Sequence, residues 1–148
     1  MSEAEFNIDS LLDGTLDDLA NVPGYQVYPP GNHKVTINWK KPTKDRPTTI
    51  GLELTAIETL ELNDSADTPL VPGTKSGVSF KMDNEYGQTA FRAVIAALAE
   101  HYGAGTNREI MEKSEGAECL VVTKIRQGKK QEGKPVAEYT DIVEIGVI

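Results

Sequence analysis

Five short segments of this chain alternate apolar and polar residues with a period of two, and no other feature restricts the possible fold as strongly. Residues 33–40, HKVTINWK, place Val35, Ile37 and Trp39 on one face. The same alternation recurs in four further segments, which are residues 49–62, 78–82, 117–126 and 135–145. Alternation of this kind predicts strands that bury one face.

The longest of these segments, residues 49–62, interrupts its own pattern once. Apolar residues follow every second position up to Ala56 and again at Leu60 and Leu62, but Glu58 lies out of pattern. A single break inside a strand is typical of a bulge, which places one extra residue in one strand of a pair. We therefore expect a bulge or bend near residues 57–58.

Only residues 85–103 show a convincing helical period. Apolar side chains recur there at spacings of three and four residues, at Phe91, Val94, Ile95, Leu98 and Tyr102. Gly103 is a suitable residue to end such a helix. The stretch TNRE at 106–109 has the pattern of a capping box and predicts a short second helical segment through Met111.

The predicted order is therefore β-β-β-α-β-β, with one convincing helix between the third and fourth strands. This is the order of the OB-fold, a small, partly open, five-stranded Greek-key barrel, although other five-stranded α+β folds share it. The chain of 148 residues is about one domain long. We expect residues 23–148 to form a mainly β (α+β), OB-fold-like domain.

The first 22 residues differ from the remainder in charge. Residues 1–20 hold six acidic residues and no basic one, whereas the rest of the chain holds 17 acidic and 15 basic residues, so most of the net charge of −8 lies in this segment. Residues 1–22 also carry leucines at helical spacing. We expect an interaction segment that binds a partner protein through Phe6, Asp17 and Asp18, or that competes with nucleic acid. A helix packed on its own domain, or a solubilising terminus, are the alternatives.

Basic residues concentrate in two other stretches, residues 40–47 and 124–134. Together they hold nine of the fifteen basic residues: Lys40, Lys41, Lys44, Arg46, Lys124, Arg126, Lys129, Lys130 and Lys134. In an OB-fold the connections between strands 1 and 2 and between strands 4 and 5 border the ligand-binding face. We expect the two stretches to converge at one lip of the barrel and hold phosphates, with Lys75 and Lys81 extending the groove. The alternative is a pair of solvated, lysine-rich turns.

Aromatic residues near these stretches are candidate platforms for stacking nucleic-acid bases, an interaction worth roughly 1–3 kcal/mol per base. The candidates are Trp39, Phe80, Tyr86 and Tyr139. Because Trp39 and Phe80 lie in register with apolar neighbours, the pattern favours the core over a stacking role for both. Tyr86 lies beside a glycine in a polar stretch and is freer to stack, while Tyr139 lies within a predicted strand.

Two parts of the chain resemble a known family. The stretch LDDLANVPGYQVYPPGNHKVTI (16–37) and the stretch ECLVVTKIRQGKKQEGKPVAEYTDIVEI (118–145) are similar to the OB-fold single-stranded-DNA-binding proteins of tailed bacteriophages. The second has their strand, basic turn and strand ending in Tyr-x-Asp-hydrophobic. The resemblance implies sequence-independent binding and protection of single-stranded DNA, or RNA, in phage replication or recombination. It also implies a replication or recombination partner for residues 1–22, although the family often carries its acidic tail at the C-terminus.

An enzyme fits the sequence poorly. The phosphate-binding, nucleophile-elbow and zinc-protease motifs are absent, only His33 and His101 supply imidazoles, and Cys119 is the single cysteine. The acidic stretches DSAD and DNE lack the ligand spacing of a calcium loop and are more typical of turns. We expect no catalytic site, no metal and no cofactor.

Two non-enzymatic alternatives remain. A protein-interaction module of phage origin that binds a basic partner would suit the negative net charge, and an oligosaccharide-binding OB-fold would not explain the surplus of lysine. Neutralising the lysines of residues 124–134 should separate DNA binding from partner binding. The sequence holds neither an apolar run long enough to span a membrane nor a signal peptide, so we expect a cytoplasmic protein of the infected bacterial cell that does not bind membranes.

Overall fold

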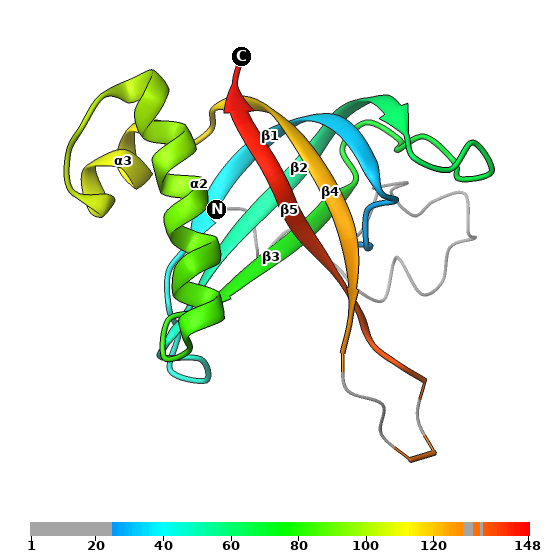
Figure 1. The fold of residues 1–148 in the computed structure, drawn as a ribbon, viewed down its shortest axis with the longest axis horizontal. Coiled ribbons are helices and arrows are strands. Elements are labelled where there is room, and N and C mark those ends of the chain that lie inside the picture. Colours follow the sequence, from blue (N-terminus) through cyan, green and yellow to red (C-terminus); the bar gives the residue numbers. More distant parts are fainter. Residues whose placement is uncertain (1–24, 129–131, 134) are drawn as a thin grey trace, which may run out of the picture.

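The computed structural model describes residues 25–128, 132–133 and 135–148. The predicted acidic segment, with Phe6, Asp17 and Asp18, lies outside the described residues, as do Lys129, Lys130 and Lys134. The described chain is mainly β, with five antiparallel strands in one sheet and two helices (Figure 1). The strands are β1 (Gly31–Lys40), β2 (Thr49–Leu62), β3 (Lys75–Lys81), β4 (Glu118–Gln127) and β5 (Glu138–Val147), in the spatial order β3-β2-β1-β4-β5.

Strand β2 has the predicted bounds and the predicted irregularity. Its pairing with β1 passes over Ile57, which confirms the expected bulge, and passes over Leu60 as well. The first bulge reverses which residues face inward, so Thr59 turns toward the interior while Leu60 is 48% exposed. The expectation that Leu60 continues the apolar face is therefore wrong, because each bulge shifts the two-residue period by one position.

Four strands begin at other residues than expected, and β1 begins two residues earlier, at Gly31, while β4 begins one residue later, at Glu118. Strand β3 begins at Lys75, three residues earlier than predicted, because Lys75 already pairs with Thr55 of β2. Strand β5 begins at Glu138, three residues later than predicted. The backbone N–H of Gly128 donates to the carbonyl of Ala137 at 2.7 Å, which places Ala137 in the connection just before β5.

Two helices, not one, lie between β3 and β4. Helix α2 (Glu85–Tyr102) buries Phe91, Val94, Ile95 and Leu98 and ends at Gly103, whose φ is +90°. Helix α3 (Asn107–Ser114) follows, with the Thr106 hydroxyl accepting from the N–H of Glu109 at 3.2 Å. The capping box thus predicted where α3 begins, and α3 continues three residues past Met111. Both helices lie on one side of the sheet in Figure 1.

An aromatic cluster joins the sheet to α2. Trp39 of β1, Phe80 of β3 and Phe91 of α2 have ring centroids 5.7 to 6.3 Å apart. Cys119 on β4 is fully buried beside this core, as its alternation with Val121 suggests, and burial raises the pKa of its thiol to about 11. The core therefore contains the predicted apolar residues of β1, β3 and β4 and those of β2 up to Ala56, with Ile142 and Ile145 of β5 partly buried against it.

The two end strands of the sheet approach each other. The side-chain oxygens of Ser76 on β3 and Thr140 on β5 are 2.7 Å apart, and both residues are buried. The Thr140 hydroxyl also accepts from the N–H of Tyr28 at 3.0 Å. Tyr28, itself fully buried, donates its O–H to the carbonyl of Thr74 at 2.6 Å. The segment before β1 therefore ties the start of β3 to the start of β5.

Candidate nucleic-acid interface

The outer face of β2 and β3, together with the end of β1, carries an open groove of about 210 Å³. We call it the outer groove. It is lined by Tyr25, Lys40, Lys41, Thr43, Arg46, Thr49, Gly51, Leu52, Glu53, Gly77, Val78 and Ser79. Most of these residues are at outward positions of the strands or belong to the connection between β1 and β2, so the fold brings together segments 50 residues apart.

Small residues form the floor of the outer groove. Gly51 pairs with Ser79, and Glu53 pairs with Gly77, so three of these four outward positions have no side chain or only a hydroxymethyl group. Glycine in a strand often marks a place where another molecule approaches the backbone closely. The floor therefore has few side chains of its own, and side chains from neighbouring segments lie over it, with Tyr25 beside Gly77 and the stem of Lys40 beside Gly51.

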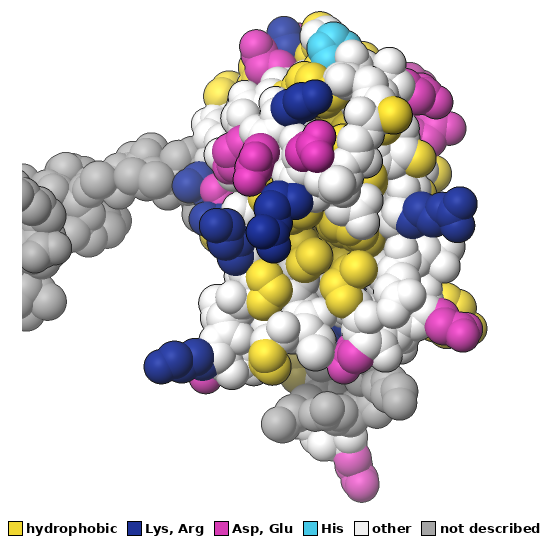
Figure 2. Space-filling model, turned by 90° about the vertical axis from the view of Figure 1, so that its left-hand side faces the viewer, with side chains coloured by type: hydrophobic (Ala, Val, Ile, Leu, Met, Phe, Trp, Pro, Cys, Tyr) yellow, Lys and Arg dark blue, Asp and Glu magenta, His cyan; other side chains and the backbone are white. Residues whose placement is uncertain are grey.

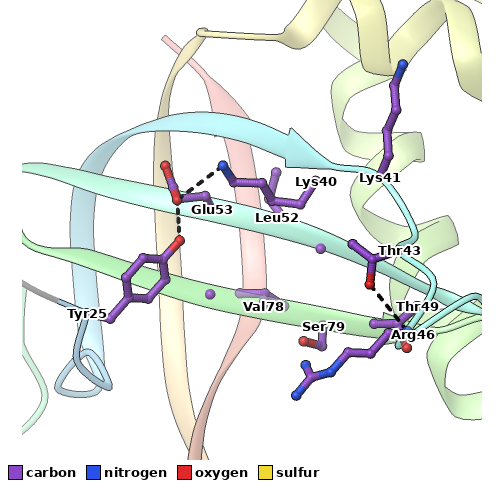
Figure 3. Close-up of a pocket in the computed structure, with 12 residues that line it drawn as sticks. Tyr25, Lys40, Lys41, Thr43, Arg46, Thr49, Leu52, Glu53, Val78 and Ser79 are labelled. Carbon is purple, nitrogen blue, oxygen red and sulfur yellow. Dashed lines mark hydrogen bonds and ion pairs between the residues drawn. The ribbon is translucent and has the colours of Figure 1, made fainter. Parts of the chain in front are cut away.

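Glu53 occupies the end of this floor and is only 9% exposed. Its carboxylate accepts a hydrogen bond from the Tyr25 hydroxyl and lies 3.6 Å from Nζ of Lys40 (Figure 3). It also lies 3.6 Å from Nζ of Lys75. The bond from Tyr25 and the two ammonium charges lower the pKa of Glu53, and they outweigh the opposing effect of burial. The carboxylate of Glu53 therefore contacts hydrogen-bond and ammonium donors from β1, from β3 and from the segment before β1.

Tyr25 presents an aromatic ring at the edge of the outer groove. Its backbone bridges Lys75, and its ring lies over Gly77, where an added Cβ would be 3.5 Å from Cε1. The side chain is nevertheless 61% exposed. Burial of the hydroxyl, followed by its bond to the Glu53 carboxylate, raises the pKa of Tyr25 to about 12. At neutral pH the ring is uncharged and available for stacking.

The predicted cations of the β1–β2 connection lie around the outer groove in different ways. Lys44 and Arg46 are exposed, and Arg46 lines the groove. Lys40 turns toward Glu53, whereas Lys41 points away toward the helices (Figure 3). Lys81, at the end of β3, is exposed and pairs with Thr49 at the same end of the groove.

The described basic residues of the two stretches do not meet at one lip, because Lys124 and Arg126 lie beyond the start of β1, whereas residues 40–47 lie at its end. Strand β4 runs antiparallel to β1, with Gly31 opposite Thr123 and Thr36 opposite Glu118. The end of β4 therefore extends past the start of β1, while the 41–48 connection follows the end of β1. The groove face lies between the ends of β1 and β5, because Ser76, the second residue of β3, lies beside Thr140 of β5, and Lys81, the last residue of β3, lies beside the 41–48 connection.

The base of the β4–β5 hairpin carries its own polar cluster. Arg126 places Nε 3.0 Å from Asp141 and its guanidinium 4.7 Å from the centroid of the Tyr139 ring. Tyr139 is 45% exposed, and Lys124 is exposed opposite Asp141. Arg126 is thus partly neutralised, and Tyr139 already has a cation over one face.

Of the remaining aromatic residues that were predicted to stack on bases, Trp39 and Phe80 lie in the core and Tyr86 lies on the surface. Trp39 donates its indole N–H to the Ser114 hydroxyl at 2.9 Å and packs in the aromatic cluster with Phe80, so neither ring is available for stacking. Tyr86 is 87% exposed in the first turn of α2. Asn84 caps α2 by accepting from the N–H of Tyr86, which accounts for the DNE stretch as helix-start chemistry.

Tyr25, Glu53 and the two floor glycines were not among the predicted site residues. Residues 22–31 have the composition of a turn and an extended linker, and Glu53 looks like any polar residue on the outward face of a strand. The available signal is the pair Gly51 and Gly77 at outward positions of two long alternating segments. Glycine there removes side chains from an exposed face without serving a turn.

A second hollow lies between the start of α2 and the start of α3. It is lined by Met82, Gln88, Phe91, Arg92, Ile95 and Asn107. Figure 2 views the molecule from the side on which the helices lie in Figure 1, and it shows hydrophobic side chains in the middle of this face with lysine and arginine around them. Half of the lining is apolar and only Arg92 is charged, so this hollow lacks the cations of the outer groove.

Neither the known protein families nor the curated proteins with which the chain was compared include a match to it. Within the described part of the chain, three or more His, Cys, Asp and Glu side chains nowhere gather in a way that could hold a metal ion. None of the described helices is long and apolar enough to cross a membrane.

Proposed function

We propose that this chain binds single-stranded DNA without sequence preference along the outer groove. Phosphates contact the cations at the end of the groove, and one base stacks on Tyr25. The observation that carries the proposal is an open, glycine-floored groove that has Arg46 in its lining, the exposed Lys44 and Lys81 at the same end, and Glu53 as the single acidic residue of its lining. Such a combination of cations and an exposed ring suits a polyanion with unpaired bases.

The strand arrangement supports an OB-fold as the scaffold. The order β3-β2-β1-β4-β5, with the end strands joined through Ser76 and Thr140, is what a five-stranded barrel opened between β3 and β5 would have. In such a barrel the outer face of strands 2 and 3 is the ligand face, bordered by the 1–2 and 4–5 connections. The outer groove occupies that face.

The physical basis of binding would be counterion release combined with stacking. Each phosphate that a lysine or arginine neutralises releases condensed ions, which makes affinity fall with salt. A base stacked on Tyr25 must be unpaired, which favours single strands over duplexes. A non-enzymatic role in phage replication or recombination, with residues 1–22 recruiting a partner protein, belongs to the same proposal and follows from the resemblance described above.

The test is a titration of fluorescently labelled oligo-dT at several salt concentrations, followed by anisotropy because Trp39 is partly buried and a poor reporter. The wild-type protein should bind at low salt with a negative slope of log affinity against log salt. The double variant Arg46→Gln/Lys81→Gln should flatten that slope by about 1.4, at ~0.7 per phosphate contact.

The matched control is Arg92→Gln/Lys113→Gln, which removes the same charge from the helices and should leave the slope unchanged. Absence of wild-type binding at low salt, or an affinity that salt does not affect, would refute DNA binding. A protein-interaction module would then be the better description of the chain.

A further inference from the structure

The donors around Glu53 form a set that would suit a phosphate. Two ammonium groups, from Lys40 and Lys75, each lie 3.6 Å from the carboxylate, and the Tyr25 hydroxyl donates to it. The donors come from β1, from β3 and from the segment before β1, and Glu53 supplies the acceptor from β2. Figure 3 shows Lys40 and Tyr25 directed at Glu53. Charged donors of this kind bind phosphate oxygens as readily as carboxylate oxygens.

The position of Glu53 makes this arrangement notable. The residue is almost buried on the face where a polyanion would bind, and a buried carboxylate without donors would be costly. Its pKa is lowered, so the carboxylate remains charged at neutral pH and repels any phosphate that approaches the floor of the groove.

We infer that Glu53 acts inside the groove as the chain's own substitute for a phosphate, and thereby determines how nucleic acid is positioned there. This inference rests on the proposed function. Lys40 and Lys75 are both engaged by Glu53, whose single negative charge offsets one of their two positive charges, and they are not phosphate contacts. Phosphates of the bound strand are confined to Arg46, Lys44 and Lys81, and a base stacks on the exposed side of the Tyr25 ring, which covers Gly77.

A consequence is that Glu53 limits the number of phosphates that the groove can neutralise. With three of the nearby donors engaged, the affinity should depend less steeply on salt than the number of lysines and arginines around the groove suggests. Glu53 also holds the Tyr25 ring in place through the hydroxyl, so that the ring needs no reordering when a base stacks on it.

The first test is Glu53→Gln, which keeps the shape of the side chain and removes its charge. Lys40 and Lys75 then become available to two phosphates, so the slope of log affinity against log salt for oligo-dT should steepen by about 1.4, at ~0.7 per contact. Glu58→Gln is the matched control, because it removes the same charge from an exposed position of the same strand and should leave the slope unchanged.

A second variant decides the matter if Glu53→Gln fails to fold, which circular dichroism would reveal. Lys40→Gln in the otherwise unchanged protein should leave the salt slope at its wild-type value, whereas Arg46→Gln should flatten it by about 0.7. Equal flattening by both variants would show that Lys40 contacts phosphate, and would overturn the inference.

The outcomes separate this inference from the proposed function. Binding by the wild type with the same slope in Glu53→Gln contradicts the role of Glu53 and leaves DNA binding intact. Binding by Glu53→Gln alone supports the role of Glu53 as an internal anion and contradicts DNA binding by the native chain. If neither protein binds oligo-dT at low salt, both proposals fail.

Discussion

His33 shows how a single buried side chain connects three parts of the chain. It is fully buried on β1, with Nε2 2.8 Å from the carbonyl of Pro29 and Nδ1 3.0 Å from the Thr59 hydroxyl. Because a carbonyl only accepts, Nε2 carries the proton, and Nδ1 accepts from Thr59. The same hydroxyl accepts from the N–H of Leu70 at 2.9 Å, so the imidazole fits this network in its neutral form.

This geometry predicts a loss of stability in mild acid. Burial lowers the pKa of His33 despite the bond to Pro29, so the unfolded chain gains a proton before the folded chain does. The free energy of unfolding should therefore fall as pH decreases below about 6.5, the usual value for histidine, until the lowered folded pKa is passed. Urea titrations at pH 7.5, 6.5 and 5.5 measure this. His33→Gln should weaken the dependence, and the exposed His101→Gln should retain it; an unchanged dependence in His33→Gln would argue against the assignment.

Tyr25 provides a second prediction at the scale of one residue. If its ring stacks on a base, Tyr25→Leu should weaken oligo-dT binding by roughly 1–3 kcal/mol, about 5- to 150-fold. Tyr25→Phe keeps the ring and loses only the bond to Glu53, so its affinity should stay within a few-fold of the wild type. Anisotropy titrations of the two variants, side by side, distinguish stacking from hydrogen bonding. Equal losses in both variants would show that the hydroxyl, rather than the ring, contributes to binding.

At the scale of the elements, close packing between β1 and β2 depends on Gly31. It pairs with Leu62, and a Cβ at this position would collide with the carbonyl of Glu61. We expect Gly31→Ala to lower the free energy of unfolding by about 1–3 kcal/mol, because either the strand or its partner must shift. Gly146→Ala is the control, since a Cβ there has no neighbour within 4 Å among the described residues. Urea unfolding measures both; equal stabilities of the two variants would contradict the register at the start of β1.

The elements also show what could be predicted from sequence. The alternation of apolar and polar residues predicted the correct bounds of β2, because a strand that buries every second residue needs an apolar side chain at every second position. The second bulge, at Leu60, could not be predicted because it exists only relative to the pairing with β1. The start of β3 could not be predicted from the sequence for another reason. Its inward residue there is Ser76, whose hydroxyl bonds to Thr140, so a polar contact replaces the apolar residue that the pattern requires.

At the scale of the whole molecule, the position of a charge matters more than the net charge. The chain carries −8, yet most of the excess lies in residues 1–20, and cations surround the outer groove. The cluster of basic residues at 40–47 is visible in the sequence, and Lys40, Lys41 and Arg46 of this cluster line the outer groove. The sequence did not predict Tyr25 or Glu53, whose roles depend on the positions of β3 and the segment before β1. The described basic residues of the two stretches do not converge, because β4 runs antiparallel to β1, a direction that the sequence does not reveal.

The most direct test of the central claim is to map where oligo-dT contacts the protein. In a ¹⁵N-labelled sample, the amide resonances of Gly51, Glu53, Gly77 and Ser79 should shift most on addition of oligo-dT at low salt, and the shifts should reverse as salt is added. The amides of Leu120 and Val143, at exposed positions of β4 and β5, should remain unchanged. If the largest shifts instead fall on β4, β5 or the helices while the floor glycines do not move, the outer groove is not the interface.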